Sequence, residues 1–242
     1  MVEALLAVDV YAREQIRDRV AEIERQLDEK HYQPGPWNKL LKDARALPRE
    51  EREALKEDIS RVSSKLHRRE GRATLPLMTG LMAEVALTVL GGVLIVFAIH
   101  GSSNLLAIIA AGIWTMTFQP LVKIAIGYLL GIEYEYAYFY GVEPRFKMRF
   151  GDYLAAPRWA RIVLHLSGTI GSPLGTWLVL VCLPTDLRIA IGVCWAIFGI
   201  VVIVNVFSFL TALFGLKRIG PFKANYSSGG SAALELREAL EI

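Results

Sequence analysis

The sequence predicts an all-α membrane protein: four transmembrane helices, a cytoplasmic helical hairpin before them, and a β-hairpin between the second and third. Three observations lead to this fold class. The 242 residues are 53% hydrophobic, with a mean hydropathy of +0.36, which soluble domains rarely reach. Charge is segregated, because residues 1–72 carry 16 Lys/Arg and 15 Asp/Glu, whereas residues 73–122 carry only Glu84. Four apolar segments each exceed the roughly 20 residues that cross a bilayer.

Residues 1–72 are expected to form a cytoplasmic helical hairpin. Apolar residues recur at spacings of three and four in 2–30 and in 38–68, which places them on one face of each helix. These residues are Ile16, Val20, Ile23 and Leu27, then Leu55, Ile59, Val62 and Leu66. The segment YQPGPW at 32–37 ends the first helix, and Pro48 interrupts the second. The short turn favours an antiparallel pair, which is either self-contained or a coiled-coil arm for a protein partner.

The four-helix transmembrane domain is expected over residues 73–216. Its apolar segments cover about 74–99, 104–132, 160–183 and 187–215. The connections HGSSN and PTD are so short that the helices they join must be antiparallel. Residues 217–242 are expected to form a cytoplasmic tail, in which Ser231 is suited to cap a short helix.

Basic residues determine the expected orientation. The 100–104 connection carries no Lys or Arg, whereas the N-terminal region, the 133–160 connection and the start of the tail are rich in them. Cytoplasmic loops carry the excess of basic residues, so both termini are expected in the cytoplasm. We therefore expect a multi-pass protein of a bacterial or archaeal inner membrane, with the first membrane helix as an uncleaved signal anchor.

Residues 133–150 alternate polar and aromatic side chains about a GVEP turn. Alternation of period two, rich in Tyr and Phe, indicates strands, and Gly141 and Pro144 mark the turn. We expect a β-hairpin with strands near 133–140 and 145–150. It would lie at the cytoplasmic membrane interface, where aromatic side chains are enriched. An amphipathic interfacial segment without strand pairing is the alternative.

Polar residues of the apolar segments form a buried polar cluster at one depth. At about 1.5 Å per residue, Glu84, Lys123 and Asn205 lie roughly 13–15 Å from the cytoplasmic edge. Thr169 stands at a similar level, and Gln119 stands one helical turn from Lys123 in the same segment. Polar groups at this depth usually face a protein interior or a water-filled cavity. The cluster is either a structural clasp or a site for a substrate, an ion or a proton. In the clasp, Glu84 pairs with Lys123, and Asn205 and Gln119 hydrogen-bond across helices.

The sequence contains no recognisable catalytic or metal-binding motif. The four histidines lack ligand spacing and neither HExxH nor CxxC occurs, so no cofactor is expected and an enzyme has little support. Cys182 and Cys194 lie in apolar segments, which does not indicate a disulfide framework. With a net charge of +3 and no basic stripe, a nucleic-acid partner is not expected. The oligomeric state is left open.

The order of motifs over residues 104–216 resembles the intramembrane site-2 protease family. The stretch QPLVKIAIGYLLGIE stands where that family has its HExxH helix. The segment EYEYAYFYGVEPRFKMRF follows where the family has a strand region, and SGTIGSP stands where a helix opens with small residues and Gly-Pro. Asn205 then stands for the Asn of the last core helix.

The resemblance implies an inactive member of that family. Gln119 replaces the first zinc histidine, Pro120 the catalytic glutamate and Lys123 the second histidine. No Asp follows Asn205 as a third ligand. A zinc hydrolase needs three ligands and a carboxylate that activates water. The implied function is a non-catalytic scaffold that binds a protein partner through residues 1–72, and a small-molecule or ion carrier that uses the polar cluster is the alternative.

Overall fold

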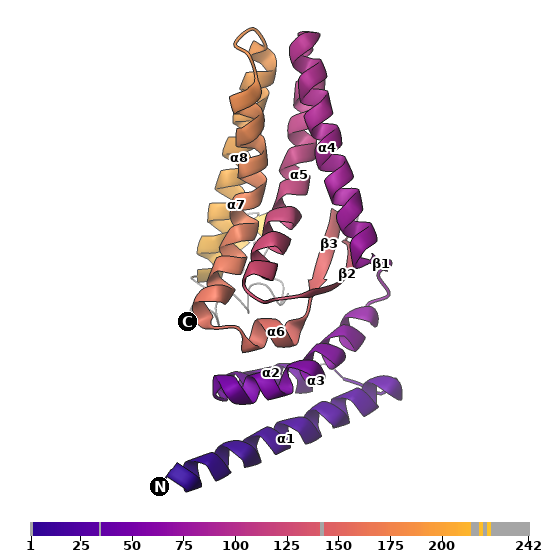
Figure 1. The fold of residues 1–242 in the computed structure, drawn as a ribbon, viewed down its shortest axis with the longest axis vertical. Coiled ribbons are helices and arrows are strands. Elements are labelled where there is room, and N and C mark those ends of the chain that lie inside the picture. Colours follow the sequence, from indigo (N-terminus) through magenta and orange to yellow (C-terminus); the bar gives the residue numbers. More distant parts are fainter. Residues whose placement is uncertain (1, 34, 141–142, 214–217, 220–221, 224–242) are drawn as a thin grey trace. The chain divides into compact units, whose positions relative to one another are not determined.

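The computed structural model describes all residues except 1, 34, 141–142, 214–217, 220–221 and 224–242 (Figure 1). The chain divides into two compact units. The first unit contains residues 1–75 together with 131–157, and the second contains residues 76–130 together with the chain from Arg158 onward. Residues 131–157, which include the predicted β-hairpin, therefore belong to the same unit as the N-terminal residues and not to the unit that holds residues 76–130.

Three helices form most of the first unit, namely α1 (Val2–Asp28), α2 (Pro36–Ala46) and α3 (Arg49–Arg68). Their apolar residues meet in a buried seam, which confirms the predicted helical faces and the interruption at Pro48. The buried members are Ile16, Val20, Ile23, Leu40, Leu41, Ala44, Leu55, Ile59 and Val62.

The helices α1 and α3 run parallel. Successive polar contacts between them join residues 37 or 38 positions apart along the chain, and a constant offset of this kind requires parallel helices. The pairs are Arg13–Glu51, Glu24–Arg61 and Asp28–Lys65. The predicted antiparallel hairpin is therefore wrong. Because the 38–68 segment breaks at Pro48, its first part becomes α2 and carries the chain back, so that α3 can start again beside α1.

A small sheet completes the first unit. Its strands are β1 (Thr74–Pro76), β2 (Tyr134–Tyr140) and β3 (Glu143–Met148), in the order β1-β2-β3. β2 and β3 pair antiparallel, with a register shift between Tyr134 and Tyr136. The predicted β-hairpin is confirmed, and the alternative of a segment without strand pairing is wrong.

The short helix α6 (Phe150–Ala155) follows β3 and packs closely on α3. Gly151 permits this contact, since a Cβ at this position would overlap the Lys56 carbonyl oxygen. The Gly151 N–H donates to Ser60 Oγ at 2.9 Å. A glycine and a small hydroxyl residue thus hold α6 at backbone distance from α3.

Two aromatic side chains of β2 lie inside the first unit. Tyr134 and Tyr136 are only 7% and 5% exposed, and the Tyr136 hydroxyl lies 3.0 Å from His67 Nδ1 of α3. Packing against the protein covers these two rings, so they belong to the core of the first unit, and the position of the hairpin at a membrane interface stays a prediction.

Four long helices form the core of the second unit, namely α4 (Leu77–His100), α5 (Asn104–Leu129), α7 (Arg158–Cys182) and α8 (Arg188–Leu213). Each is long and apolar enough to cross a membrane, which for α8 holds over Arg188–Phe207. The predicted apolar segments are therefore confirmed as helices. Many of their large apolar side chains are exposed, a surface that suits lipid better than water.

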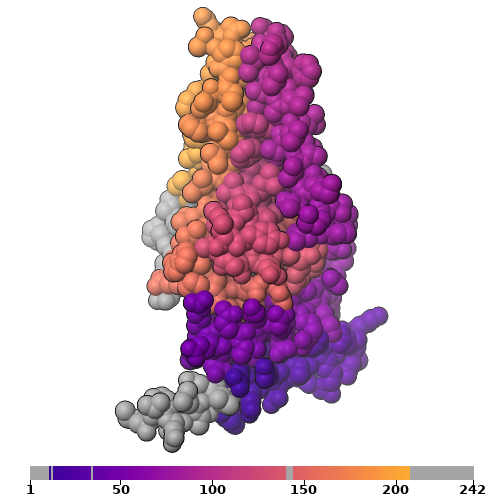
Figure 2. Space-filling view, in the orientation of Figure 1, coloured from indigo at the N-terminus to yellow at the C-terminus, as the bar shows by residue number. Residues whose placement is uncertain are grey.

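Helix α5 lies between α4 and α7, and α8 packs on α7 and α5. Figure 2 shows α5 (pink) at the surface between α4 (purple) and α7 (orange). Beyond α8 the structure describes two short paired strands, β4 (Arg218–Ile219) and β5 (Phe222–Lys223). The rest of the predicted 217–242 tail, including the helix expected at Ser231, lies outside the described residues.

Candidate functional site: a polar ladder in the second unit

A row of contacts that involve polar side chains joins α5 to α7. Its three rungs, which we call the polar ladder, are Thr115–Thr176, Gln119–Ser172 and Lys123–Gly168. Successive rungs are four residues apart on both helices. This spacing arises because the helices are antiparallel and residues four apart share one face of a helix.

The rungs differ in chemistry. The hydroxyl oxygens of the first rung lie 2.6 Å apart, and in the second the Ser172 hydroxyl donates to Gln119 Oε1 at 3.2 Å. In the third, the aliphatic stem of Lys123 lies against Gly168, where a Cβ would be 3.4 Å from Lys123 Cδ. Two of the five predicted cluster members, Gln119 and Lys123, therefore lie on the α5 side of the ladder.

Between the rungs the two backbones approach closely at glycines. A Cβ at Gly171 would lie 2.6 Å from Gln119 Cα, and a Cβ at Gly175 would overlap the Trp114 carbonyl oxygen. Small residues at helical spacing allow such contacts between membrane helices. Backbones this close leave no space between α5 and α7 for a substrate at this level.

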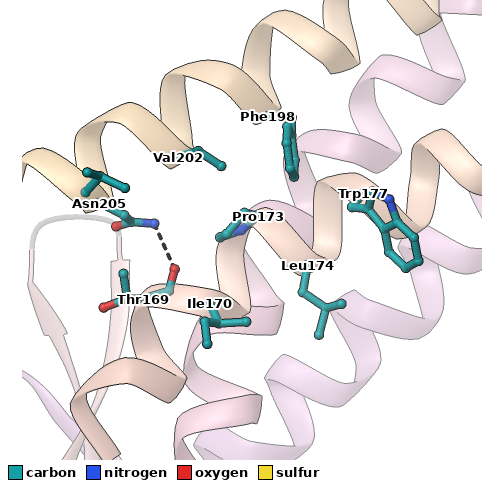
Figure 3. A pocket seen from close by; sticks show the side chains of 9 residues that line it. Thr169, Ile170, Pro173, Leu174, Trp177, Phe198, Val202 and Asn205 are labelled. Atoms are coloured by element: carbon teal, nitrogen blue, oxygen red, sulfur yellow. Dashed lines mark hydrogen bonds between the residues drawn. The ribbon is translucent and has the colours of Figure 1, made fainter. Parts of the chain in front are cut away.

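Thr169 and Asn205 meet because of a proline in α7. Pro173 has no N–H, so the Thr169 carbonyl oxygen four residues earlier loses its helical hydrogen bond. Asn205 Nδ2 of α8 donates to this oxygen at 3.0 Å (Figure 3). The Thr169 hydroxyl donates within α7, to His165 O at 3.1 Å. The structure thus joins these two predicted members to each other through a backbone oxygen. The predicted hydrogen bond between Asn205 and Gln119 is wrong, because Asn205 donates to Thr169 O and Gln119 accepts from Ser172.

A groove with a volume of about 360 Å³ lies between α7 and α8 beside this hydrogen bond (Figure 3). Its lining is apolar apart from Thr169 and Asn205. Gln119 and Lys123 are not among its lining residues, so the groove and the polar ladder are separate features.

Glu84 is buried on α4, with 1% of its surface exposed. One turn further along, Thr88 O accepts the indole N–H of Trp114 at 2.8 Å, which fixes the register of α4 against α5. Because α4 and α5 are antiparallel, the residue four positions before Thr88 on α4 is level with the residue four positions after Trp114 on α5. Glu84 is therefore level with Phe118 and about one turn from Lys123. The Glu84–Lys123 pair stays a prediction.

Sequence reasoning left Arg161 and His165 out of the cluster, although both are buried on α7. With Gly168, these α7 residues stand at spacings of four and three, which puts them on the face that carries the ladder. That spacing is the signal that could have found them.

A second polar cluster lies in the first unit, where α3 meets β2. The ring of His67 lies 4.3 Å from the ring of Tyr138, and its Nδ1 lies 3.0 Å from the Tyr136 hydroxyl. Burial lowers the pKa of His67, and the positive charges of Lys147 and Arg72 lower it further. Burial also raises the pKa of Tyr136 to about 12. At neutral pH the imidazole is thus neutral and the phenol protonated.

Within the described part of the chain, no group of three or more His, Cys, Asp or Glu side chains is placed to hold a metal ion. No protein-family model, curated protein or solved structure matches this chain.

Proposed function

We propose that this chain is a non-catalytic membrane protein in which the second unit is the anchor and the first unit binds a protein partner. The closed packing of the polar ladder carries the proposal. A substrate or ion site within a membrane needs a cavity or a water path. The ladder residues are instead used in contacts between α5 and α7, at a point where two glycines bring the backbones together. This packing favours a structural clasp.

We further propose that the chain is an inactive relative of the intramembrane site-2 proteases. Gln119 and Lys123, at the positions implied for the zinc histidines, both contact α7, and the β2–β3 hairpin lies between the two helices in sequence, as the resemblance implies. Residues at these positions that do not bind metal can instead contribute to packing between the helices. Elemental analysis of the purified protein should find no tightly bound zinc, and stoichiometric zinc would contradict this kinship as an inactive member.

The proposed partner surface is the exposed side of α2 together with Arg49, the first residue of α3. Leu40 and Leu41 of α2 pack into the seam, whereas Lys39 and Lys42 are exposed, as is Arg49. None of these three cations has an ion pair with another described residue. Exposed cations attract an acidic surface and steer its approach. The partner is therefore proposed to be a protein with an acidic patch.

Photo-crosslinking tests this surface in the full-length chain. A photoreactive amino acid at Lys42, in native membranes, should give a discrete crosslinked product. Replacing both Lys39 and Arg49 with Glu should abolish that product, because the surface changes sign. Lys30→Glu changes an exposed cation in the turn after α1 and is the matched control, which should keep the product. A product insensitive to the double substitution would contradict the assigned surface.

The carrier alternative differs in the water access that it requires. Lys123→Cys, in a chain whose Cys182 and Cys194 are replaced by Ser, should resist a membrane-impermeant thiol reagent if the ladder is closed. Ser102→Cys, in the exposed turn between α4 and α5, is the reactive control. Ready reaction at position 123 would favour a carrier.

We also propose that both termini lie in the cytoplasm, on the basis of the distribution of basic residues. In intact cells, a cysteine at Ser102 should react with an external reagent and a cysteine at Ser228 should be protected. The reverse pattern would overturn this orientation.

A further inference from the structure

Two arginines of the first unit lie over the rings of two tyrosines of β2. The guanidinium carbon of Arg68 lies 5.2 Å from the centre of the Tyr136 ring, and that of Arg72 lies 5.5 Å from the centre of the Tyr138 ring. Stacking on an aromatic face fixes the plane of a guanidinium, whose N–H groups lie along its edge and can bind an oxyanion in pairs. The two arginines are therefore preorganised for a ligand with several acceptor oxygens.

The same face of the sheet carries two more cations. Tyr136 is paired with Lys147 across β2 and β3, and Tyr138 is paired with Arg145. Side chains of residues directly opposite each other in an antiparallel pair lie on one face of the sheet. We use the name basic sheet face for the two tyrosines together with Arg68, Arg72, Arg145 and Lys147.

The described contacts of this face include two acids for its four cations. Glu70 forms an ion pair with Arg72 at 2.6 Å, in which both side chains are partly exposed, and Glu135 bonds to Ser64 of α3. Exposed ion pairs contribute little to stability, so a phosphate, which offers several charged oxygens, can replace the Glu70 carboxylate at Arg72. The excess of cations over acids suits an anionic ligand.

Chain connections hold this face close to the membrane helices. β1 ends at Pro76 and α4 begins at Leu77, while β2 begins five residues after α5 ends at Leu129. Arg72 precedes Leu77 by five residues, so its backbone is at most about 18 Å from the start of α4. The headgroup layer is about 5–8 Å thick on each side of the hydrocarbon. If α4 spans the membrane, the connection therefore keeps Arg72 near that layer.

We propose that the basic sheet face binds the headgroup phosphate of an anionic membrane lipid, with Arg68 and Arg72 holding the phosphate oxygens. The proposal rests on the membrane anchor proposed above. Any basic residue beside a membrane helix attracts anionic lipid. Two guanidinium groups held by aromatic rings add a geometric requirement, because lysine has the same charge but lacks the planar fork. Replacing arginine with lysine therefore separates a built site from general attraction.

Native mass spectrometry of the full-length chain in detergent provides the test. The chain is mixed with equal amounts of phosphatidylglycerol and phosphatidylcholine, and the ratio of the two bound lipids is measured. Phosphatidylglycerol should be preferred, and Arg68→Lys with Arg72→Lys should lower the ratio at least about fivefold, the net effect of one lost hydrogen bond. Arg25→Lys with Arg49→Lys, at two exposed arginines outside this face, is the matched control and should keep the ratio.

Tyr138→Leu removes the ring beside Arg72 but keeps all four cations, so it should also lower the ratio. An unchanged ratio in either variant, or equal binding of the two lipids to the unaltered chain, would overturn the site and leave the anchor intact. Inorganic phosphate that displaces phosphatidylglycerol at an equal concentration would overturn lipid as the ligand in favour of a soluble phosphate. A chain that stays in solution without detergent would overturn the anchor, and this proposal with it.

Discussion

The main helix pair of each unit is packed by a different kind of residue. In the first unit, α1 and α3 run parallel and bury branched apolar side chains such as Ile16, Val20 and Ile59, with ion pairs along the flanks. In the second unit, α5 and α7 run antiparallel and meet through glycines, hydroxyls and an amide. Both pairs keep a constant register, but large apolar residues lie inside one and largely outside the other.

This difference follows from the solvent that each pair is suited to. In water, burying a large apolar side chain stabilises by about 1.5–3 kcal/mol, whereas a surface ion pair adds about 0–1 kcal/mol, so apolar residues fill the seam and charges take the flanks. In lipid, burying a leucine against another helix gains nothing over exposing it. Close backbone contact and hydrogen bonds between helices then hold the pair together. Each prediction below tests one part of this contrast.

The largest effect is expected where the membrane-type interface is tightest. Gly171→Val should destabilise the second unit by at least about 3 kcal/mol, the top of the usual range for overpacking, because the new Cβ meets the backbone at Gln119 and not a flexible side chain. Thermal unfolding in detergent measures the loss. Gly112→Val on α5 is the matched control, since a Cβ there meets nothing within 4 Å. Equal losses in the two variants would refute the tight interface.

The sequence predicts where the helices and strands lie along the chain better than the directions in which the helices run. Proline breaks, period-two alternation and long apolar runs located the helices and the β-hairpin, since each is a local signal. The direction of α3 was missed because the turn at 32–37 determines only how α2 leaves α1. Pro48 was recognised as a break, but nothing local states that the chain then reverses again.

The sequence predicts at which depth the residues of the candidate site lie, but not which residues are their hydrogen-bond partners. Counting residues along each helix brought Thr169 and Asn205 to one level, and the missing N–H of Pro173 could have identified the free carbonyl oxygen. Which donor would reach that oxygen depends on the register of α8 against α7, which the sequence does not state. The hydroxyl rungs were overlooked because Ser and Thr are common in membrane helices and carry no depth signal of their own.

The second prediction concerns charges inside the membrane-type unit. Lys123→Met alone and Glu84→Leu alone should each destabilise by about 2.5 kcal/mol, since each change leaves the other charge uncompensated in an apolar setting. The double variant should recover much of the loss, because a buried ion pair is often no better than a packed apolar substitute. Additive losses in thermal unfolding would show that the two residues are not coupled, and Lys123 would then need another counter-ion.

The third prediction tests the proline explanation for Asn205. Asn205→Leu should cost about 1 kcal/mol, the usual size of a hydrogen bond between membrane helices, because it leaves the Thr169 carbonyl oxygen without its donor. Pro173→Ala restores a backbone N–H four residues after Thr169, so in that background the same Asn205 change should cost almost nothing. A double-mutant cycle on thermal stability measures the coupling. An unchanged cost in the Pro173→Ala background would refute the assigned role.

The smallest effect is expected in the first unit and is a dependence of its unfolding stability on pH. The folded pKa of His67 lies below its unfolded value near 6.5, so the unfolded chain binds more protons between the two values. Stability should therefore fall as the pH drops from about 7 through that window. Trp37 lies in the first unit and the other four tryptophans lie in the second, so the difference in fluorescence between the chain and a Trp37→Phe variant follows the unfolding of the first unit.

His67→Gln keeps a polar partner for the Tyr136 hydroxyl but cannot titrate, so it should flatten this pH dependence. His31→Gln, an exposed change outside the cluster, should leave it intact. The hydrogen bond between Gln119 and Ser172 in the second unit joins groups that do not titrate, so it adds nothing to such a slope. A slope that persists in His67→Gln would mean that other groups of the first unit carry the pH dependence, and the contrast between the units would then not rest on this histidine.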